Sequence, residues 1–227
     1  MECSSRLAGV LSLLALAAGW SACSAPGSRT PRPLDLAEPA EQVLLRFHLE
    51  KRGDGRSGTL KVVLRRQASG FELRASDPLG RGLWTLRVVP TGALWLDLRS
   101  RRACALPIEG GARGLGWPDL PWDVLPAIFL GEPPVAESGP DAGGRHWILE
   151  RDATGRVLSW SVREGESDSP LAIYRREGDV HFLSSDALGV TVRWTEVARE
   201  HVPQAPPLLT RMPAGFQSGG CDALELP

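Results

Sequence analysis

The sequence predicts a mainly β protein: a strongly curved antiparallel sheet that forms an incomplete barrel, with a short apolar helix covering its concave side. Short segments of alternating apolar and polar residues recur through most of the chain, separated by turns rich in Gly, Pro and Asp. One segment, Trp117–Gly131, favours a helix. A sheet of about ten strands twists too strongly to stay flat. A helix that is apolar nearly all round has to be buried.

The first 22 residues are interpreted as a lipoprotein signal peptide. Leu7–Ala18 is an apolar run that is too short to span a bilayer. The sequence Ser21–Cys23 follows it and is typical of a lipobox, in which the cysteine is acylated and becomes the new N-terminus. Trp20 departs from the pattern, because Leu is usual there. The alternative is an ordinary secretory signal that is cut after Ser24 or Ala25, with Cys23 removed or left unmodified.

Acylation of Cys23 would anchor the chain in a membrane, because each buried methylene contributes about 0.8 kcal/mol. Ser24 follows this cysteine. In Gram-negative lipoproteins, which this segment resembles, a residue other than Asp there implies sorting to the outer membrane, with the domain facing the periplasm. Residues 23–40 are rich in Pro, Ser and Ala and have no periodicity, which predicts a flexible tether.

Residues 41–216 are expected to form the folded domain, which begins with six strands. Apolar residues alternate with polar ones in each segment, and short turns join the segments into an up-and-down meander. The segments are Val43–Glu50, Thr59–Arg65, Phe71–Ala75, Leu83–Val89, Leu94–Arg99 and Ala103–Leu106.

The helical segment Trp117–Gly131 comes next. Pro118 and Pro121 suit a first turn, where a missing N–H costs nothing, and Gly131 suits the left-handed end of a helix. Pro126 in mid-helix would bend the axis, so we expect a short kinked helix or two helical turns. The apolar residues of the segment cover most of its circumference: they are Leu120, Trp122, Val124, Leu125, Ile128, Phe129 and Leu130.

A second set of strands follows the flexible loop that we expect at Glu132–Gly144. Pro203–Pro207 is expected to end the regular structure, and residues 217–227 to form a loose C-terminal tail. The five expected strands are His146–Glu150, Val157–Arg163, Leu171–Arg175, Val180–Leu183 and Val190–Val197.

In this arrangement the chain resembles the bacterial lipoprotein-localisation family of LolA/LolB-like half-barrels. The segments that carry the resemblance are Arg74–Gly80, Leu94–Arg101, Leu125–Gly131 and Pro213–Phe216. The resemblance implies an apolar cavity that takes acyl chains beneath a helical lid. The residues it implies for cavity or lid are Leu120, Trp122, Val124, Leu125, Ile128, Phe129, Leu45, Phe47, Leu94 and Leu96. No clear match to the exposed apolar loop of the family's receptor member is found.

The sequence contains no hydrolase elbow, zinc-protease motif, Cys-x-x-Cys or phosphate-binding glycine loop. We therefore expect no enzymatic activity, no metal and no cofactor. His48 with Glu50, and His146 with Glu150, are interpreted as solvated sheet faces. Asp77 is interpreted as a side chain that caps its own turn. A structure that brought His48 and His181 together with carboxylates in one cleft would revive an enzymatic function.

The remaining cysteines of the mature chain are Cys104 and Cys221. In an oxidising compartment they could form a disulfide, or they could stay a buried thiol and a tail thiol. The net charge is −1 without a basic cluster of the kind that nucleic-acid-binding proteins carry.

The expected function is that of a membrane-anchored, monomeric lipoprotein that binds lipid or lipoprotein acyl chains non-covalently. Such a protein would act in lipoprotein insertion or lipid trafficking at the outer membrane, without a nucleic-acid partner. The alternative is a tethered interaction module that has a filled core and no ligand, and that acts through a loop such as Glu132–Gly144.

Overall fold

Thirteen strands and one helix make up the described part of the chain. The computed structural model describes residues 37–51, 57–108, 111–112, 119–165, 167–186 and 188–219. In chain order the elements are β1 (Glu38–Lys51), β2 (Ser57–Gln67), β3 (Gly70–Ser76), β4 (Gly82–Val89), β5 (Gly92–Asp97), β6 (Arg102–Leu106), α1 (Val124–Leu130), β7 (Gly139–Pro140), β8 (Arg145–Arg151), β9 (Val157–Glu164), β10 (Ala172–Glu177), β11 (Val180–Ser185), β12 (Val190–Ala205) and β13 (Gln217–Ser218).

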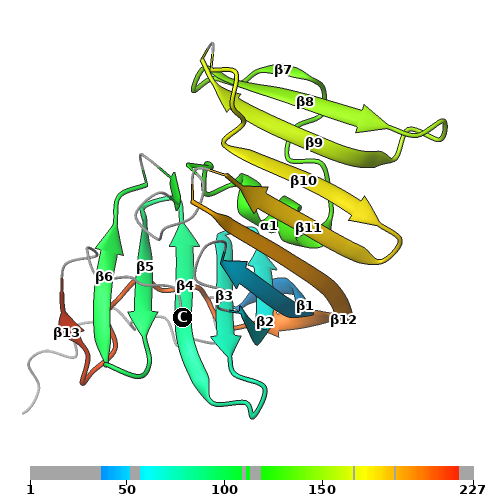
Figure 1. Ribbon diagram of the computed structural model, residues 1–227. Helices are drawn as coiled ribbons and strands as arrows, with labels where there is room; N and C mark the ends of the chain where they lie inside the picture. Colours follow the sequence, from blue (N-terminus) through cyan, green and yellow to red (C-terminus); the bar gives the residue numbers. More distant parts are fainter. Residues whose placement is uncertain are drawn as a thin grey trace, which may run out of the picture. The chain divides into compact units, whose positions relative to one another are not determined.

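All thirteen strands form one sheet, in the order β13-β6-β5-β4-β3-β2-β1-β12-β11-β10-β9-β8-β7. Two meanders, β1 to β6 and β7 to β12, are joined by the antiparallel pairing of β1 with β12. The short edge strands β13 and β7 do not meet, so the sheet curves without closing. Figure 1 shows the sheet and places α1 behind β10 and β11. The predicted incomplete barrel with one short helix is confirmed.

The pair β1–β12 is longer than the sequence patterns predicted. β12 continues past Val197 to Ala205, so the expectation that Pro203–Pro207 ends the regular structure is wrong for its first residues. The reason is a register shift: Glu38 faces Ala205 while Ala40 faces Val202, which leaves one extra residue on β12. A proline within such a bulge removes no ladder hydrogen bond.

The helix α1 begins later than predicted and comprises about two turns. It starts at Val124, which makes Pro126 its third residue. Because the first N–H groups of a helix have no intrahelical partner, Pro126 costs no hydrogen bond, and the expected kink is not needed. The expected end is confirmed, since Gly131 follows with a left-handed φ of 69°. Trp117 and Pro118 lie outside the described residues.

The described end of the chain returns to the sheet. Gln217 and Ser218 form β13, which runs parallel to β6, and the backbone N–H of Gly219 donates to the Ala103 carbonyl at 3.0 Å. Phe216 packs against the buried side chains of Leu94, Leu96 and Ala103. These contacts cover a second apolar face of β5 and β6.

Cys104 on β6 is disulfide-bonded. Cys221 lies outside the described residues, so its pairing with Cys104 stays a prediction. Gly219, which is bonded to β6, precedes Cys221 by two residues in the sequence. This proximity in the chain favours the predicted pair.

Candidate functional site: an apolar helix on the concave face

The predicted lid and cavity residues fall into two groups. Eight of them belong to the main core cluster, which is formed by the concave face of the sheet together with α1: Leu45, Phe47, Leu120, Trp122, Val124, Leu125, Ile128 and Phe129. Leu94 and Leu96 do not join them. They lie on the other face of β5 beneath Phe216, because Ala93 and Trp95 take the concave side of that strand.

An aromatic cluster holds the C-terminal turn of α1 against the sheet. The ring of Phe129 meets Phe47 edge-on at a centroid distance of 5.5 Å and Trp194 at 5.9 Å. Phe47 and Trp194, which face each other across β1 and β12, are stacked at 5.6 Å. The indole N–H of Trp194 donates to the Phe129 carbonyl at 3.0 Å. Sheet and helix are therefore joined by oriented contacts as well as by apolar burial.

The residues that precede α1 are fixed to the end of β6. The indole N–H of Trp122 donates to the Pro107 carbonyl at 3.2 Å, and Trp122 itself is only 4% exposed. The backbone N–H of Ala112 donates to the Leu120 carbonyl at 3.0 Å. Gly111 has a φ of +59°, and a Cβ there would lie 2.1 Å from the same carbonyl oxygen, so only glycine fits.

A buried histidine lies against the other end of α1. A Cβ at Gly131 would be 2.3 Å from Cε1 of His181. The imidazole stacks on Trp194 at 5.3 Å, and its Nδ1 is hydrogen-bonded to the Tyr174 hydroxyl at 2.7 Å. Burial lowers the pKa of His181 to about 4, with a smaller contribution from the charge of Arg176. Burial also raises the pKa of Tyr174 to about 12. Both groups are therefore neutral at physiological pH.

Ion pairs fix the chain where it leaves α1. Arg66 on β2 contacts Glu132 at 2.9 Å and Glu41 at 2.7 Å. Arg199 on β12 contacts Glu41 at 2.8 Å and Glu196 at 2.7 Å. The Arg66 guanidinium thus bridges the residue after Gly131 and the rim of the sheet. Sequence reasoning missed this network, because its members come from four distant segments.

A pocket of about 420 Å³ opens beside Trp122, at the N-terminal end of α1. Its volume is within the range of roughly 300–1,000 Å³ that is usual for small-molecule sites. Most of its lining side chains are apolar; Ser69, Asp123 and Arg145 are the polar ones. The lining residues are Ala68, Ser69, Gly70, Phe71, Val88, Val89, Pro90, Ile108, Gly111, Pro121, Trp122, Asp123 and Arg145. Of the predicted cavity residues, only Trp122 lines it.

His48 and His181 are not brought into one cleft. His48 lies on the convex face beside Thr59, at 3.4 Å, while His181 is buried on the concave side. Asp77 accepts hydrogen bonds from the backbone and side chain of Arg81 at 2.9 and 2.6 Å, as the turn-capping interpretation predicted. Among the described residues no group of three or more His, Cys, Asp or Glu side chains could hold a metal ion.

Solved structures with a similar fold include lipoprotein-sorting proteins. One is a LolA superfamily protein from Nitrosomonas europaea, with 8% identity, a TM-score of 0.44, and coverage of 71% of this chain and 85% of that one. Another is described as an outer membrane lipoprotein-sorting protein domain from Vibrio parahaemolyticus, with 8% identity, a TM-score of 0.43 and the same coverage. A DUF1329 family protein from Desulfovibrio piger has 6% identity, a TM-score of 0.41, and coverage of 81% and 89%.

No protein-family model matches the sequence, and no curated protein matches it as a relative. At these identities and TM-scores the similarity concerns the overall fold alone. In the part of the chain that the structure describes, no helix has the length and apolar character to cross a membrane.

Proposed function

We propose that this protein is a lipoprotein, anchored through acylated Cys23, that binds lipid or the acyl chains of other lipoproteins non-covalently. α1 would act as a movable lid on the concave face. The observation that carries the proposal is the combination of a helix buried on nearly all sides with an apolar pocket at its N-terminal end. The signal at residues 1–22, the outer-membrane location and the monomeric state are proposed from the sequence. The tether predicted at 23–40 is proposed only as far as β1, because Glu38 and Ala40 already pair with β12.

Exchange of contacts supplies a mechanism for such binding. An acyl chain that enters beside Trp122 and displaces part of α1 replaces apolar contacts of the helix with contacts of its own. Burial of apolar surface, whether by the helix or by the acyl chain, contributes about 25 cal/mol of free energy per Å². Lid and ligand then compete for the same lining, so the net affinity stays modest and the ligand can be released. The ion pairs of Arg66 at the other end would keep the helix attached to the rim while its first turn moves.

A fluorescent fatty acid tests the proposal. In the Cys23→Ala protein we expect the probe to bind with increased fluorescence, and Val89→Trp to weaken binding at least tenfold, because the indole would fill the pocket. Leu158→Trp is the matched control: Leu158 is 43% exposed on β9 and does not line the pocket. An absence of binding, or equal binding by both variants, would contradict acyl binding in this pocket.

A second function is favoured by the filled centre of the domain. The side chains of Phe47, Phe129 and Trp194 occupy the concave face in mutual contact. A protein with such a core would act as a tethered interaction module, through the loop Glu132–Gly144. Asp141 orders the end of this loop by accepting hydrogen bonds from Gly143, Arg145 and the Trp147 indole. Failure of the fatty acid to bind folded protein would leave this second function.

A further inference from the structure

The convex face of the sheet carries a row of basic side chains. One lies on each of the strands β3, β2, β1, β12 and β10, and all five are exposed. Their neighbours in each strand point the other way into the core, as Leu45, Phe47 and Leu60 do. The basic row consists of Arg74, Lys61, Arg46, Arg193 and Arg175.

Strand register places these side chains beside one another. Lys61 is directly opposite Arg46 across β2 and β1. Arg193 is opposite His48, two residues along β1 from Arg46 and on the same face. Because neighbouring strands are about 4.8 Å apart and residues about 3.3 Å apart along a strand, the Cα atoms of Lys61 and Arg193 lie roughly 12 Å apart, with Arg46 between them. Phe182 of β11 continues the row, and the Arg175 guanidinium lies 4.8 Å above its ring.

The middle of the row forms no ion pair within the described residues, although Glu50 lies on the same face of β1, two residues beyond His48. Arg74 is paired with Glu72 and Arg175 with Glu177. Lys61, Arg46 and Arg193 make no such pair. Like charges directly opposite each other destabilise a sheet, so this arrangement contributes nothing to folding. It provides three neighbouring sites for anionic groups.

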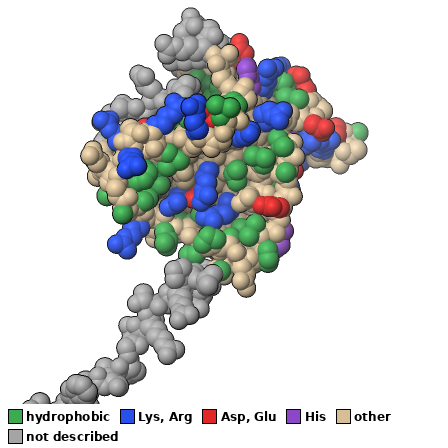
Figure 2. Space-filling view, turned by 90° about the horizontal axis from the view of Figure 1, so that it is seen from below, with side chains coloured by type: hydrophobic (Ala, Val, Ile, Leu, Met, Phe, Trp, Pro, Cys, Tyr) green, Lys and Arg blue, Asp and Glu red, His purple; other side chains and the backbone are tan. Residues whose placement is uncertain are grey.

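Apolar side chains accompany the cations. Leu44 and Val63 face each other beside Lys61 and Arg46 and are half-buried, and Val197, at the bulge of β12, is 49% exposed. Figure 2 shows Lys and Arg side chains with apolar ones between them on the face that it presents, together with fewer acidic ones. A surface that mixes unpaired cations with exposed apolar groups suits the interface of an anionic bilayer, where phosphate groups lie above acyl chains.

We propose that the convex face at β2, β1 and β12 docks on an anionic phospholipid surface, with Lys61, Arg46 and Arg193 contacting lipid phosphates. This docking is independent of the acyl-binding pocket, because it uses the opposite face of the sheet. It would hold α1 and the pocket away from the bilayer.

Vesicle binding of the full chain with Cys23→Ala tests this docking, because no acyl anchor can then form. We expect the protein to partition onto phosphatidylglycerol–phosphatidylcholine vesicles more strongly than onto pure phosphatidylcholine, and added salt to weaken the binding. Lys61→Glu with Arg46→Glu should lower the partition coefficient more than tenfold, since each basic residue near an anionic surface contributes a factor of roughly five.

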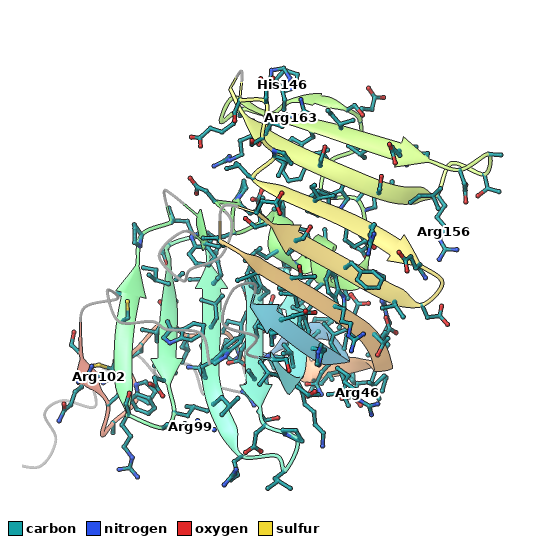
Figure 3. The ribbon with its side chains drawn as sticks, in the orientation of Figure 1. Arg46, Arg99, Arg102, His146, Arg156 and Arg163 are labelled. Carbon is teal, nitrogen blue, oxygen red and sulfur yellow. The ribbon has the colours of Figure 1, made fainter. Side chains whose placement is uncertain are left out.

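Arg99→Glu with Arg156→Glu is the matched control, because it changes the net charge equally. Figure 3 shows that both residues lie away from Arg46; Arg99 is in the turn between β5 and β6, and Arg156 directly precedes β9. This variant should bind nearly as wild type does. Single Arg46→Glu should lower binding and raise the thermal midpoint, because a glutamate would then face Lys61. A loss of vesicle binding by Arg46→Glu is therefore not caused by unfolding of the protein.

Three results would overturn the proposal. Equal losses in the two double variants would mean that net charge alone drives binding. Equal binding to both kinds of vesicle would remove the role of the phosphatidylglycerol charge. The third result is that the Cys23→Ala protein, with its basic row unchanged, does not bind anionic vesicles. In that case the basic row does not dock on a bilayer, and an acidic protein is the partner left for it.

Discussion

At the scale of single residues, His181 is a buried titratable group that lies against the end of α1. It lies under Gly131, bonded to Tyr174 and stacked on Trp194. Its pKa, lowered by burial to about 4 from the ordinary 6.5, means that folding favours the neutral ring. The stabilisation from the neutral ring is complete above pH 6.5 and is lost as the pH falls toward 4.

Acidification should therefore destabilise the domain through this residue. We expect His181 to account for a loss of up to roughly 3 kcal/mol of unfolding free energy between pH 7 and pH 4. Urea unfolding across this range measures it. His181→Gln should be less stable at pH 7 but lose less on acidification, whereas His146→Gln, at an exposed position, should follow wild type. Parallel pH profiles for wild type and His181→Gln would refute the assignment.

Glu72 is a second residue whose role is set by its surroundings. It is 1% exposed, yet it lies on the convex side of β3 between three arginines. Its carboxylate contacts Arg87 at 2.6 Å, Arg74 at 2.7 Å and Arg65 at 3.5 Å. Burial lowers the pKa of Arg65, and Arg74 and Arg87 add to the effect while Glu72 opposes it. The Glu72 carboxylate thus offsets the positive charge of three neighbouring guanidinium groups.

Glu72→Gln should cost roughly 3 kcal/mol of unfolding free energy, because it leaves neighbouring guanidinium groups without their counter-charge. Glu200→Gln, an exposed carboxylate that accepts a hydrogen bond from Gln42 at 2.7 Å, should change stability by no more than about 0.5 kcal/mol. Chemical denaturation of the two variants makes the comparison. Similar stabilities for both would show that Glu72 is not needed to offset the arginines.

At the scale of elements, the end of α1 depends on a glycine for two reasons. Gly131 has a left-handed φ of 69°, and the space beside it is occupied by His181. Gly155, in the turn before β9, has a similar φ of 85° but nothing within 4 Å of the Cβ position. The two glycines therefore separate backbone strain from steric conflict.

Gly155→Ala should cost about 1 kcal/mol, from the left-handed backbone alone. Gly131→Ala should cost more, on the order of 3 kcal/mol, because the helix end or the imidazole must also move. Thermal unfolding of both variants tests this difference. If the costs are equal, the close approach of Gly131 to His181 does not constrain α1.

At the scale of the whole molecule, the two meanders share one core. β1 pairs with β12 along nearly its whole length, and the main cluster contains side chains from both meanders and from α1. Neither meander can bury its concave face without the other and the helix. The domain should therefore unfold as one cooperative unit.

Phe47→Ala should expose this cooperativity, because Phe47 contacts both Phe129 and Trp194. We expect a loss of about 3–5 kcal/mol, with backbone amides of β3–β5 and β9–β11 losing hydrogen-exchange protection together. Tryptophan fluorescence and far-ultraviolet circular dichroism should give coincident transitions. Earlier loss of protection in one meander would show that the halves are separate folding units.

The sequence by itself determined most strands and the burial of the helix. Alternation in segments such as Val43–Glu50 reflects which side chains of a strand meet apolar neighbours, and this is a local property. The all-round apolar character of α1 required burial wherever the helix lay. For the same reason, the turn role of Asp77 and the glycine end of α1 were predictable.

Only the tertiary structure decided which faces meet. β5 is apolar on both sides, so its pattern could not tell whether Leu94 and Leu96 or Trp95 would line the concave face; Phe216, more than a hundred residues later, covers the leucines. The register of β1 against β2 and β12 likewise set Lys61 and Arg46 opposite each other. Such pairings join residues that are distant in sequence. Periodicity within one strand does not reveal which strands pair with it, or in which register.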